Sequence, residues 1–346
     1  VMKLYRIFRR FAEPMSDGSG RYMLHYSLGS KALMEMFGSQ TAQLASRLGS
    51  ALPRPPQRQS DAGDEAKRAN RVEGMTLREF LIWSRRLREA EVEWYRQEFE
   101  RADVDKGGFL DEDEIRLVLH RVGYTPLRAV ILDLIEAVGP LKGNVMDFDE
   151  FVEMMEIFRT NNGFTRNEVK EFRQSFDMFD TDQSGEVDVI QVGHILRSLG
   201  ISAELQQVQA LVRTVDWNGS NALDFNEFLR LMRLQREDEL LRVKEAFDRI
   251  AEATVTDDGD IRVTIEPKQV AEMFRYLGYP ESVGKSTLDL FLVMVKNALD
   301  YDALVLLVDS CRRMNMQKMR KQASFTDDAV EKFRRLFRSL DEDSRW

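Results

Sequence analysis

The twelve-residue stretch Asp180-Thr-Asp-Gln-Ser-Gly-Glu-Val-Asp-Val-Ile-Gln191 decides the fold of this 346-residue chain. Oxygen-bearing side chains occupy its positions 1, 3, 5 and 9, and Gly185 occupies position 6, where the backbone has to turn sharply. Closely spaced oxygen donors are the ligands that hard cations such as Ca²⁺ prefer in proteins. Apolar residues at helical spacing flank the stretch on both sides, so the sequence predicts a metal-binding loop between two helices.

The pattern around this loop recurs with a period near 77 residues. Each repeat carries a glycine that closes an apolar helix, at intervals of 77 and 78 residues, and an aspartate in a second matching segment, at intervals of 77 and 76 residues. A period of this length is too long for one helix-turn-helix unit and fits a pair of them. The markers are Gly123, Gly200 and Gly278, and Asp147, Asp224 and Asp300.

In residues 164–232 the chain resembles the calmodulin superfamily of paired EF-hands. Thr165-Arg-Asn-Glu168 caps a helix that runs into the loop, "RSLG" (197–200) ends the first hand, and "LDFNEFLRLM" (223–232) ends the second. The repeat extends the resemblance over residues 75–322. It implies an all-α fold of tandem paired EF-hands, built as three calmodulin-like lobes, in which twelve-residue loops hold Ca²⁺.

The repeat and the composition divide the chain into five segments. We expect a basic N-terminal arm with a Pro-rich linker, two EF-hand pairs, a third and degenerate pair, and a C-terminal helix that matches the start of a further hand. Their boundaries are residues 1–74, 75–160, 161–236, 237–322 and 323–346.

Within the first segment, residues 1–11 predict a short basic amphipathic helix. Two interpretations are open for it: a helix docked on the body with its basic face in solvent, or an anchor for a membrane surface, a partner or a targeting system. A second helix is expected over residues 30–48. Thr76 and Glu79 form a capping-box signature that opens a long helix ending at Ala102.

Two loops carry the most complete oxygen sets at the family's ligand positions. In the first, Gly107 stands at position 5, where a water has to replace the side chain; in the fourth, Asn221 replaces the turn glycine and tolerates a left-handed backbone. The resemblance implies Ca²⁺ at both loops. The candidate ligands are Asp103, Asp105, Phe109 (carbonyl), Asp111 and Glu114 in the first, and Asp216, Asn218, Ser220, Ala222 (carbonyl), Asp224 and Glu227 in the fourth.

The third loop, residues 180–191, has a weaker set, because its position 12 is a glutamine where loops one and four have glutamate. We expect weak Ca²⁺ binding there, or Mg²⁺, which accepts fewer protein ligands and keeps its waters. A collapsed, empty loop is an equal alternative. The candidate ligands are Asp180, Asp182, Ser184, Glu186 (carbonyl), Asp188 and Gln191.

The other loops lack ligands. The second, residues 139–150, is expected only to lend a short strand to the first. The fifth contains about seven extra residues, including an acidic turn at residues 257–260 that is out of register, and the sixth keeps "ALDYDAL" (298–304) without ligands. Residues 278–287 resemble a phosphate-binding P-loop but follow a helix, so we expect a linker and no nucleotide.

Composition narrows the function. The net charge of −9 combines an acidic body with an arm that has 11 Lys and Arg against 6 Asp and Glu in residues 1–70. An acidic body disfavours nucleic-acid binding. The longest apolar runs are too short for a transmembrane helix, and the single cysteine, Cys311, favours a reducing compartment. No nucleophile, acid–base pair or cofactor motif is present, so an enzyme is not expected.

Two functions remain open. The first, favoured because no pair has two intact loops, is a non-enzymatic calcium-binding structural or adaptor component of a larger cytoskeletal or axonemal assembly in the cytoplasm. Its partners would be proteins, either amphipathic helices or a filament or assembly surface, and the basic arm would contact an acidic surface. The alternative is a cytosolic Ca²⁺ sensor that exposes hydrophobic grooves to bind amphipathic target helices.

Overall fold

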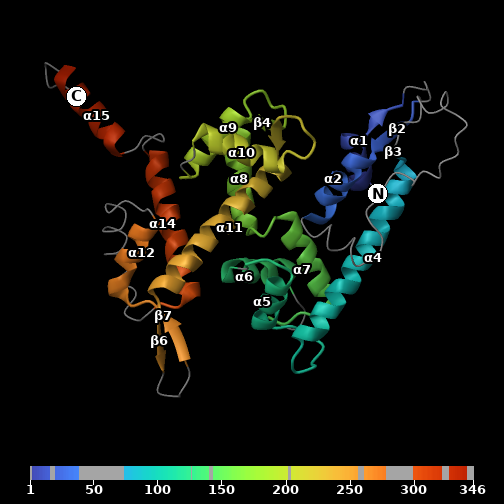
Figure 1. Cartoon of the computed structure of the whole chain (residues 1–346), viewed down its shortest axis with the longest axis horizontal. Helices are drawn as coiled ribbons and strands as arrows, with labels where there is room; N and C mark the ends of the chain where they lie inside the picture. Colours follow the sequence, from blue (N-terminus) through green and yellow to red (C-terminus); the bar gives the residue numbers. More distant parts are fainter. Residues whose placement is uncertain are drawn as a thin grey trace, which may run out of the picture. The chain divides into compact units, whose positions relative to one another are not determined.

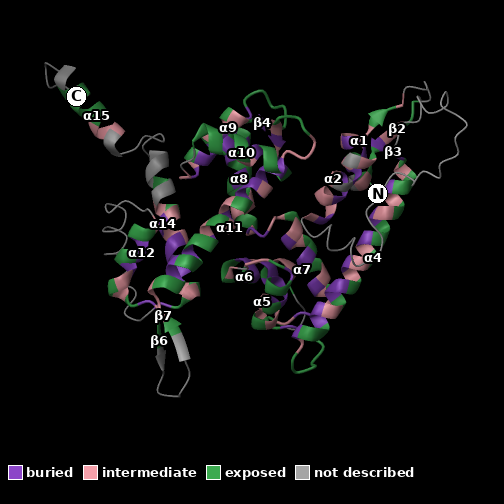
Figure 2. Ribbon diagram, in the orientation of Figure 1, coloured by how far each residue is buried: buried purple, intermediate pink, exposed green. Residues whose placement is uncertain are grey.

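The chain contains two long helices of 26 residues each, α4 (Leu77–Ala102) and α11 (Phe225–Ile250), which belong to the predicted hands. Helix α4 begins as the sequence predicts. The amide of Glu79 donates to Thr76 Oγ1 at 3.3 Å, and the amide of Thr76 donates to Glu79 Oε2 at 2.8 Å. This reciprocal pairing satisfies two backbone donors that have no partner inside the helix. Buried and exposed residues alternate along both helices, which indicates that each packs on one face (Figure 2).

The computed structural model describes residues 2–15, 20–38, 74–125, 127–139, 143–201, 204–255, 261–277, 299–321 and 327–340. These residues are mostly helical (Figure 1). They fall into two units, Val1–Arg166 with Asp216–Ser220, and Asn167–Val215 with Asn221–Trp346. Among the described residues, no helix combines the length and the apolar character needed to cross a bilayer.

The first pair of hands has four helices whose apolar faces share one core. Leu110 and Met146, both fully buried, form an antiparallel bridge with N–H···O distances of 2.8 and 2.9 Å. The second loop therefore lends the first a strand contact, as predicted. The helices are α4, α5 (Glu112–Arg121), α6 (Arg128–Val138) and α7 (Phe148–Thr160).

The N-terminal residues fold onto this pair. Ile7, Phe8 and Phe11 are at most 6% exposed, and the Phe8 ring centroid lies 5.7 Å from that of Phe80 on α4. Residues 1–11 therefore form a helix docked on the body, which is one of the two interpretations that the amphipathic pattern left open. Around it a three-stranded antiparallel sheet has the order β1-β2-β3. The elements are α1 (Met2–Phe11), β1 (Glu13–Pro14), β2 (Tyr22–His25), α2 (Tyr26–Phe37) and β3 (Gly74–Met75).

Helix α2 covers the first part of the helix predicted over residues 30–48. It begins earlier, at Tyr26, and ends at Phe37, where Gly38 adopts a left-handed backbone with φ +67°. Residues 39–48 of that prediction lie outside the described residues. The Pro-rich segment lies in residues 39–73, outside the described residues.

The second pair repeats the arrangement of the first. Val187 and Leu223, both fully buried, face each other in the antiparallel pair of β4 and β5. The rings of Phe172, Phe176 and Phe228 pack edge-on or tilted beneath the strands. The elements are α8 (Arg166–Phe179), β4 (Glu186–Asp188), α9 (Val189–Ser198), α10 (Leu205–Val215), β5 (Ala222–Asp224) and α11.

The segment predicted as the third pair, residues 237–322, has a similar bridge and a different loop. Ile265 and Leu299 form the antiparallel contact that matches the bridges of the first two pairs. The fifth loop contains the antiparallel strands of a β-hairpin. The acidic turn of that loop, Asp257, Asp258 and Asp260, lies outside the described residues, and so do residues 278–287. The elements are α11, β6 (Glu252–Val255), β7 (Ile261–Thr264), the 3₁₀ turn η2 (Pro267–Gln269), α12 (Val270–Tyr276) and α14 (Tyr301–Lys321).

The C-terminal helix α15 spans Asp327–Leu340. The acidic residues at 341–343 that resemble the start of another loop lie outside the described residues.

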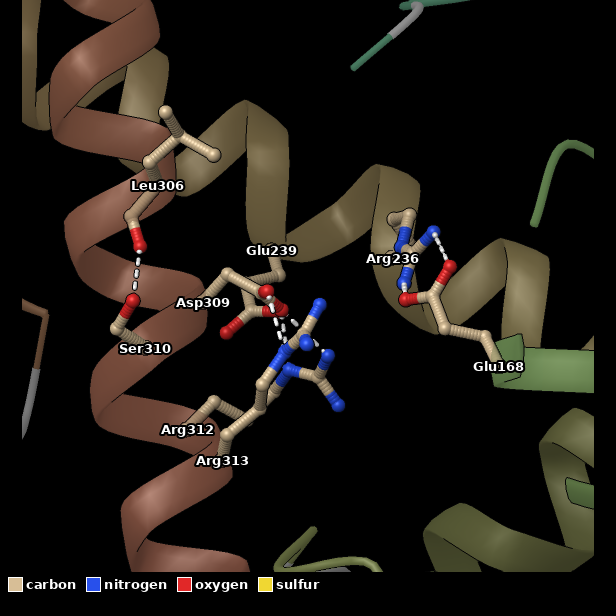
Figure 3. A network of polar contacts seen from close by, with 8 residues as sticks. All are labelled: Glu168, Arg236, Glu239, Leu306, Asp309, Ser310, Arg312 and Arg313. Atoms are coloured by element: carbon tan, nitrogen blue, oxygen red, sulfur yellow. Dashed lines mark hydrogen bonds and ion pairs between the residues drawn. The ribbon is translucent and has the colours of Figure 1, made fainter. Parts of the chain in front are cut away.

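An ion pair recurs in all three pairs, and we call these three contacts the seam pairs. Each joins a glutamate, twelve residues before the first position of the odd-numbered loop, to an arginine on the last helix of the pair. Arg236 Nη2 lies 2.5 Å from Glu168 Oε1, and Arg312 Nε lies 3.9 Å from Glu239 Oε2 (Figure 3). In the first pair Arg159 contacts Glu91.

The glutamates of the seam pairs become more exposed from the first to the third. The Glu91 side chain is 0% exposed, Glu168 13% and Glu239 33%. Burial lowers and the attraction of Glu91 raises the pKa of Arg159, with a net increase. Because buried charges require a partner, the first two contacts hold the last helix of the pair against the first, whereas the third is longer and more exposed and contributes less.

Candidate metal centres

Hydrogen bonds from backbone amides position the first two carboxylates of loop one, residues 103–114. The Gly107 and Gly108 amides donate to the two carboxylate oxygens of Asp103, each at 2.9 Å, and the Gly107 amide also reaches Asp105 Oδ1 at 2.8 Å. A Cβ at Gly107 would lie 2.9 Å from that oxygen, so a side chain at position 5 would require the Asp105 carboxylate to shift. The loop keeps its first two carboxylates turned inward.

The last ligand position of loop one belongs to the first turn of α5. Glu114 accepts from the Val104 amide through Oε1 and from the Asp111 amide through Oε2, both at 3.1 Å. In the described part of the chain, Asp103, Asp105 and Glu114 bring one ligand atom each to within 4.8 Å of one another. Carboxylates this close repel each other unless a cation lies between them. The donor set, all oxygen and strongly anionic, fits Ca²⁺.

Left-handed residues shape three of the loops at the same two positions. Position 6 is Gly108, Gly185 or Asn221, with φ values of +75°, +80° and +61°. The sequence predicted this position, including the asparagine. It did not identify position 4, which is also left-handed in all three loops; the residues there are Lys106, Gln183 and Gly219.

Loop four, residues 216–227, shows the same amide pattern at its start. The Ser220 amide donates to Asp216 Oδ1 at 3.1 Å and to Asn218 Oδ1 at 2.8 Å. At its end, Asp224 and Glu227 form the capping box of α11. Glu227 is only 1% exposed. A carboxylate at this depth is stable when it is charged only with hydrogen bonds or a cation beside it.

Loop three resembles loop one in its first half and differs in its last residue. The Ser184 and Gly185 amides donate to Asp180 at 3.0 and 2.9 Å, and hydrogen bonds from Ser184 hold the pKa of Asp182 below its usual value. The Gln191 amide group, however, donates from Nε2 to the Phe179 carbonyl at 2.9 Å. The side chain predicted as a weak ligand is therefore engaged with the helix that enters the loop.

The second loop keeps only its helix cap, in which the Glu150 amide donates to Asp147 Oδ1 at 2.9 Å. Gly139 and Gly143 stand at its ligand positions 1 and 5 and have no side-chain oxygen, and Leu141 lies outside the described residues. Nothing in this loop offers an alternative set of donors among the residues that the structure describes.

Pairs of helix–loop–helix hands, joined back to back by a short antiparallel contact and carrying oxygen-rich loops, define the class of EF-hand proteins. The comparisons agree with the geometry. A family model described as an EF-hand domain pair matches residues 169–233. Residues 169–233 are thus an EF-hand pair, and the chain is similar to calmodulin-like calcium-binding proteins.

Several curated proteins are similar to parts of the chain. The "Probable calcium-binding protein CML13" of Oryza sativa subsp. japonica is 28% identical over 138 residues, 40% of this chain and 79% of that protein. "Calcium-binding protein 4" of Mus musculus is 28% identical over 165 residues, which are 47% of this chain and 61% of the mouse protein. "Calcium-binding protein CML19" of Arabidopsis thaliana is 32% identical over 116 residues, 34% and 66% of the two chains.

Proposed function

We propose that this chain is a non-enzymatic protein that binds Ca²⁺ at loops one and four, where the ion has a structural role. The convergence of Asp103, Asp105 and Glu114 carries the proposal for loop one, since it brings together three carboxylates at the family's ligand positions. The Phe109 carbonyl and Asp111 complete that set. For loop four the proposed ligands are the six predicted from its sequence, and the related proteins named as calcium-binding support both sites.

Calorimetric titration of the full chain tests the site assignment. We expect two Ca²⁺ per chain, and the loss of one in Glu114→Gln and of one in Glu227→Gln, because each removes the last carboxylate of its loop. Asp113→Asn is the matched control: it removes one charge from loop one at a position that is not a ligand, and both ions should remain. Unchanged stoichiometry in Glu114→Gln would exclude loop one.

We further propose that the protein is an adaptor in a larger cytoplasmic assembly, cytoskeletal or axonemal, that its three pairs form three lobes, and that its partners are amphipathic helices or an assembly surface. One observation supports a fixed rather than a switching body: the seam pairs occur in every predicted pair, whether or not its loops retain ligands.

The alternative is a Ca²⁺ sensor, which the calmodulin-like relatives favour. Fluorescence of a dye that binds apolar surface separates the two functions. An adaptor with structural ions should show little change between chelator and micromolar Ca²⁺. A large rise in dye fluorescence, lost in Glu114→Gln or Glu227→Gln, would establish the sensor and reject the adaptor.

A further inference from the structure

Position 12 of hand three is Gln191. The matching position of hand five, nine residues before the closing glycine Gly278 as Gln191 is before Gly200, is Gln269, and the two side chains make the same unusual contact. Gln191 Nε2 donates to the carbonyl of Phe179, the last residue of the entering helix α8, at 2.9 Å. Gln269 Nε2 donates to the carbonyl of Ile250, the last residue of the entering helix α11, at 3.5 Å, and also to Glu252 Oε1 at 3.0 Å. The two contacts are independent of each other, since they lie in different pairs.

The other end of each amide caps the exiting helix. The Asp188 amide donates to Gln191 Oε1 at 2.8 Å, and the Glu266 amide donates to Gln269 Oε1 at 2.9 Å. Each glutamine therefore joins the end of one helix to the start of the next through its two amide atoms. The carbonyl that it meets is one of the last four of a helix, which have no partner inside that helix.

A carboxylate at position 12 cannot make this contact, because it has no proton to donate. Glu114 in hand one shows the difference. Its two oxygens only accept, from the amides of Val104 and Asp111, and one of its oxygens lies among the carboxylates of Asp103 and Asp105. In hand one Glu114 therefore reaches the loop amide of Val104 but cannot donate to a carbonyl of the entering helix, and a cation shared by the carboxylates would add the link to Asp103 at the end of that helix.

We propose that Gln191 and Gln269 are positioning residues whose amide groups replace the metal ion as the link between the two helices of hands three and five. These hands hold their helices together with or without Ca²⁺. The inference rests on the proposed function, because it assigns the ion-dependent behaviour to hands one and four alone. It also explains how hand five remains paired with hand six through the bridge at Ile265 although its loop start, Ala251, offers no side-chain ligand.

The test is amide hydrogen exchange of the full chain, resolved by residue, in chelator and in Ca²⁺. In the wild type, the amides of Ser184 and Gly185 should be protected in chelator. Gln191→Glu keeps the cap and removes the donor, so in chelator their exchange should become about tenfold faster, as expected for the loss of one half-buried hydrogen bond. Calcium should restore protection in Gln191→Glu, because the variant recreates a complete loop of carboxylates.

Two further variants complete the design. Gln174→Glu makes the same charge change on an exposed position of α8 and should leave the exchange unchanged. Gln269→Glu should loosen hand five, with a second carboxylate now facing Glu252, and Ca²⁺ should not restore it. Rescue by Ca²⁺ in the first variant and not in the second distinguishes the replaced ion from a merely structural hydrogen bond.

The outcomes separate the two proposals. If Gln191→Glu exchanges as slowly as the wild type in chelator, or if wild-type Ser184 and Gly185 are unprotected until Ca²⁺ is added, the replacement of the ion is rejected and loop three becomes a cation site. If the amides of Gly107 and Ser220 do not respond to Ca²⁺, the proposed function fails, whatever hands three and five do.

Discussion

Neutralising Glu91 should destabilise the first pair of hands far more than neutralising a surface glutamate on the same helix. Glu91 is 0% exposed and contacts Arg159, Arg88 Nη1 at 2.6 Å and the Tyr95 hydroxyl at 3.2 Å. In Glu91→Gln, Arg88 keeps its contact with Glu156 at 3.3 Å, but Arg159, with its side chain only 18% exposed, loses its ion pair and remains charged at the seam. Removing one partner of a buried ion pair costs about 3–5 kcal/mol.

Glu89→Gln is the matched control, because it makes the same change two residues earlier on α4. Glu89 pairs with Arg85 at 2.8 Å, but the two side chains are 61% and 82% exposed. Exposed pairs of this kind contribute about 0.2–1 kcal/mol. The prediction therefore concerns a difference of several-fold between two chemically identical substitutions on one helix.

Urea denaturation followed by tryptophan fluorescence measures the difference, since Trp83 and Trp94 lie on α4. With a denaturant slope of about 2 kcal/mol/M, Glu91→Gln should lower the midpoint by about 1.5–2.5 M. Adding Arg159→Met to Glu91→Gln should recover most of the loss, because no unpaired charge remains at the seam. If Glu91→Gln lowers the midpoint no more than Glu89→Gln, the account of the seam pairs is wrong.

Three further outcomes are expected. Burial raises the pKa of Cys311 to about 12, so a thiol reagent at pH 8 should modify the native chain slowly and the urea-unfolded chain fast. The contribution of the protonated thiol to the free energy of unfolding is complete below pH 9 and is lost as the pH rises toward 12. Phe8→Ala should cost about 3–5 kcal/mol in urea denaturation, whereas Tyr5→Ala, at a position 44% exposed, should stay within about 0.5 kcal/mol. Glu239→Gln should cost less than Glu168→Gln in the same assay, because its ion pair is longer and more exposed.

Local backbone chemistry was the part of the structure that sequence reasoning predicted well. The capping box at Thr76 and the left-handed Asn221 depend only on residues within a few positions of each other, so a single sequence contains the necessary information. Position 4 of the loops was missed because two of its three occupants, Lys106 and Gln183, are not residues that favour a left-handed backbone. There the loop as a whole imposes the conformation.

Contacts between distant segments were the part that it missed. The amphipathic pattern of residues 1–11 identifies an apolar face but not the N-terminal half of α4 that covers it, since more than sixty residues separate them. The seam pairs could have been predicted from the sequence, because Glu168 and Arg236 follow Glu91 and Arg159 by one full repeat. The hairpin of β6 and β7 also had a signal, alternating β-branched residues on both sides of an acidic turn with glycine.

Helix α11, through its length, connects two neighbouring hands rigidly. It ends hand four and begins hand five without interruption, and it carries Arg236 of one seam pair and Glu239 of the next within a single turn (Figure 3). Inserting one residue between them would rotate everything that follows by about 100° and advance it by about 1.5 Å. Each ion pair lies wholly on one side of the insertion and could still form, but the third predicted pair would be turned relative to the second. An insertion of seven residues, close to two full turns, would preserve the rotational phase. The number of residues between Arg236 and Glu239 therefore sets the orientation of the third predicted pair relative to the second.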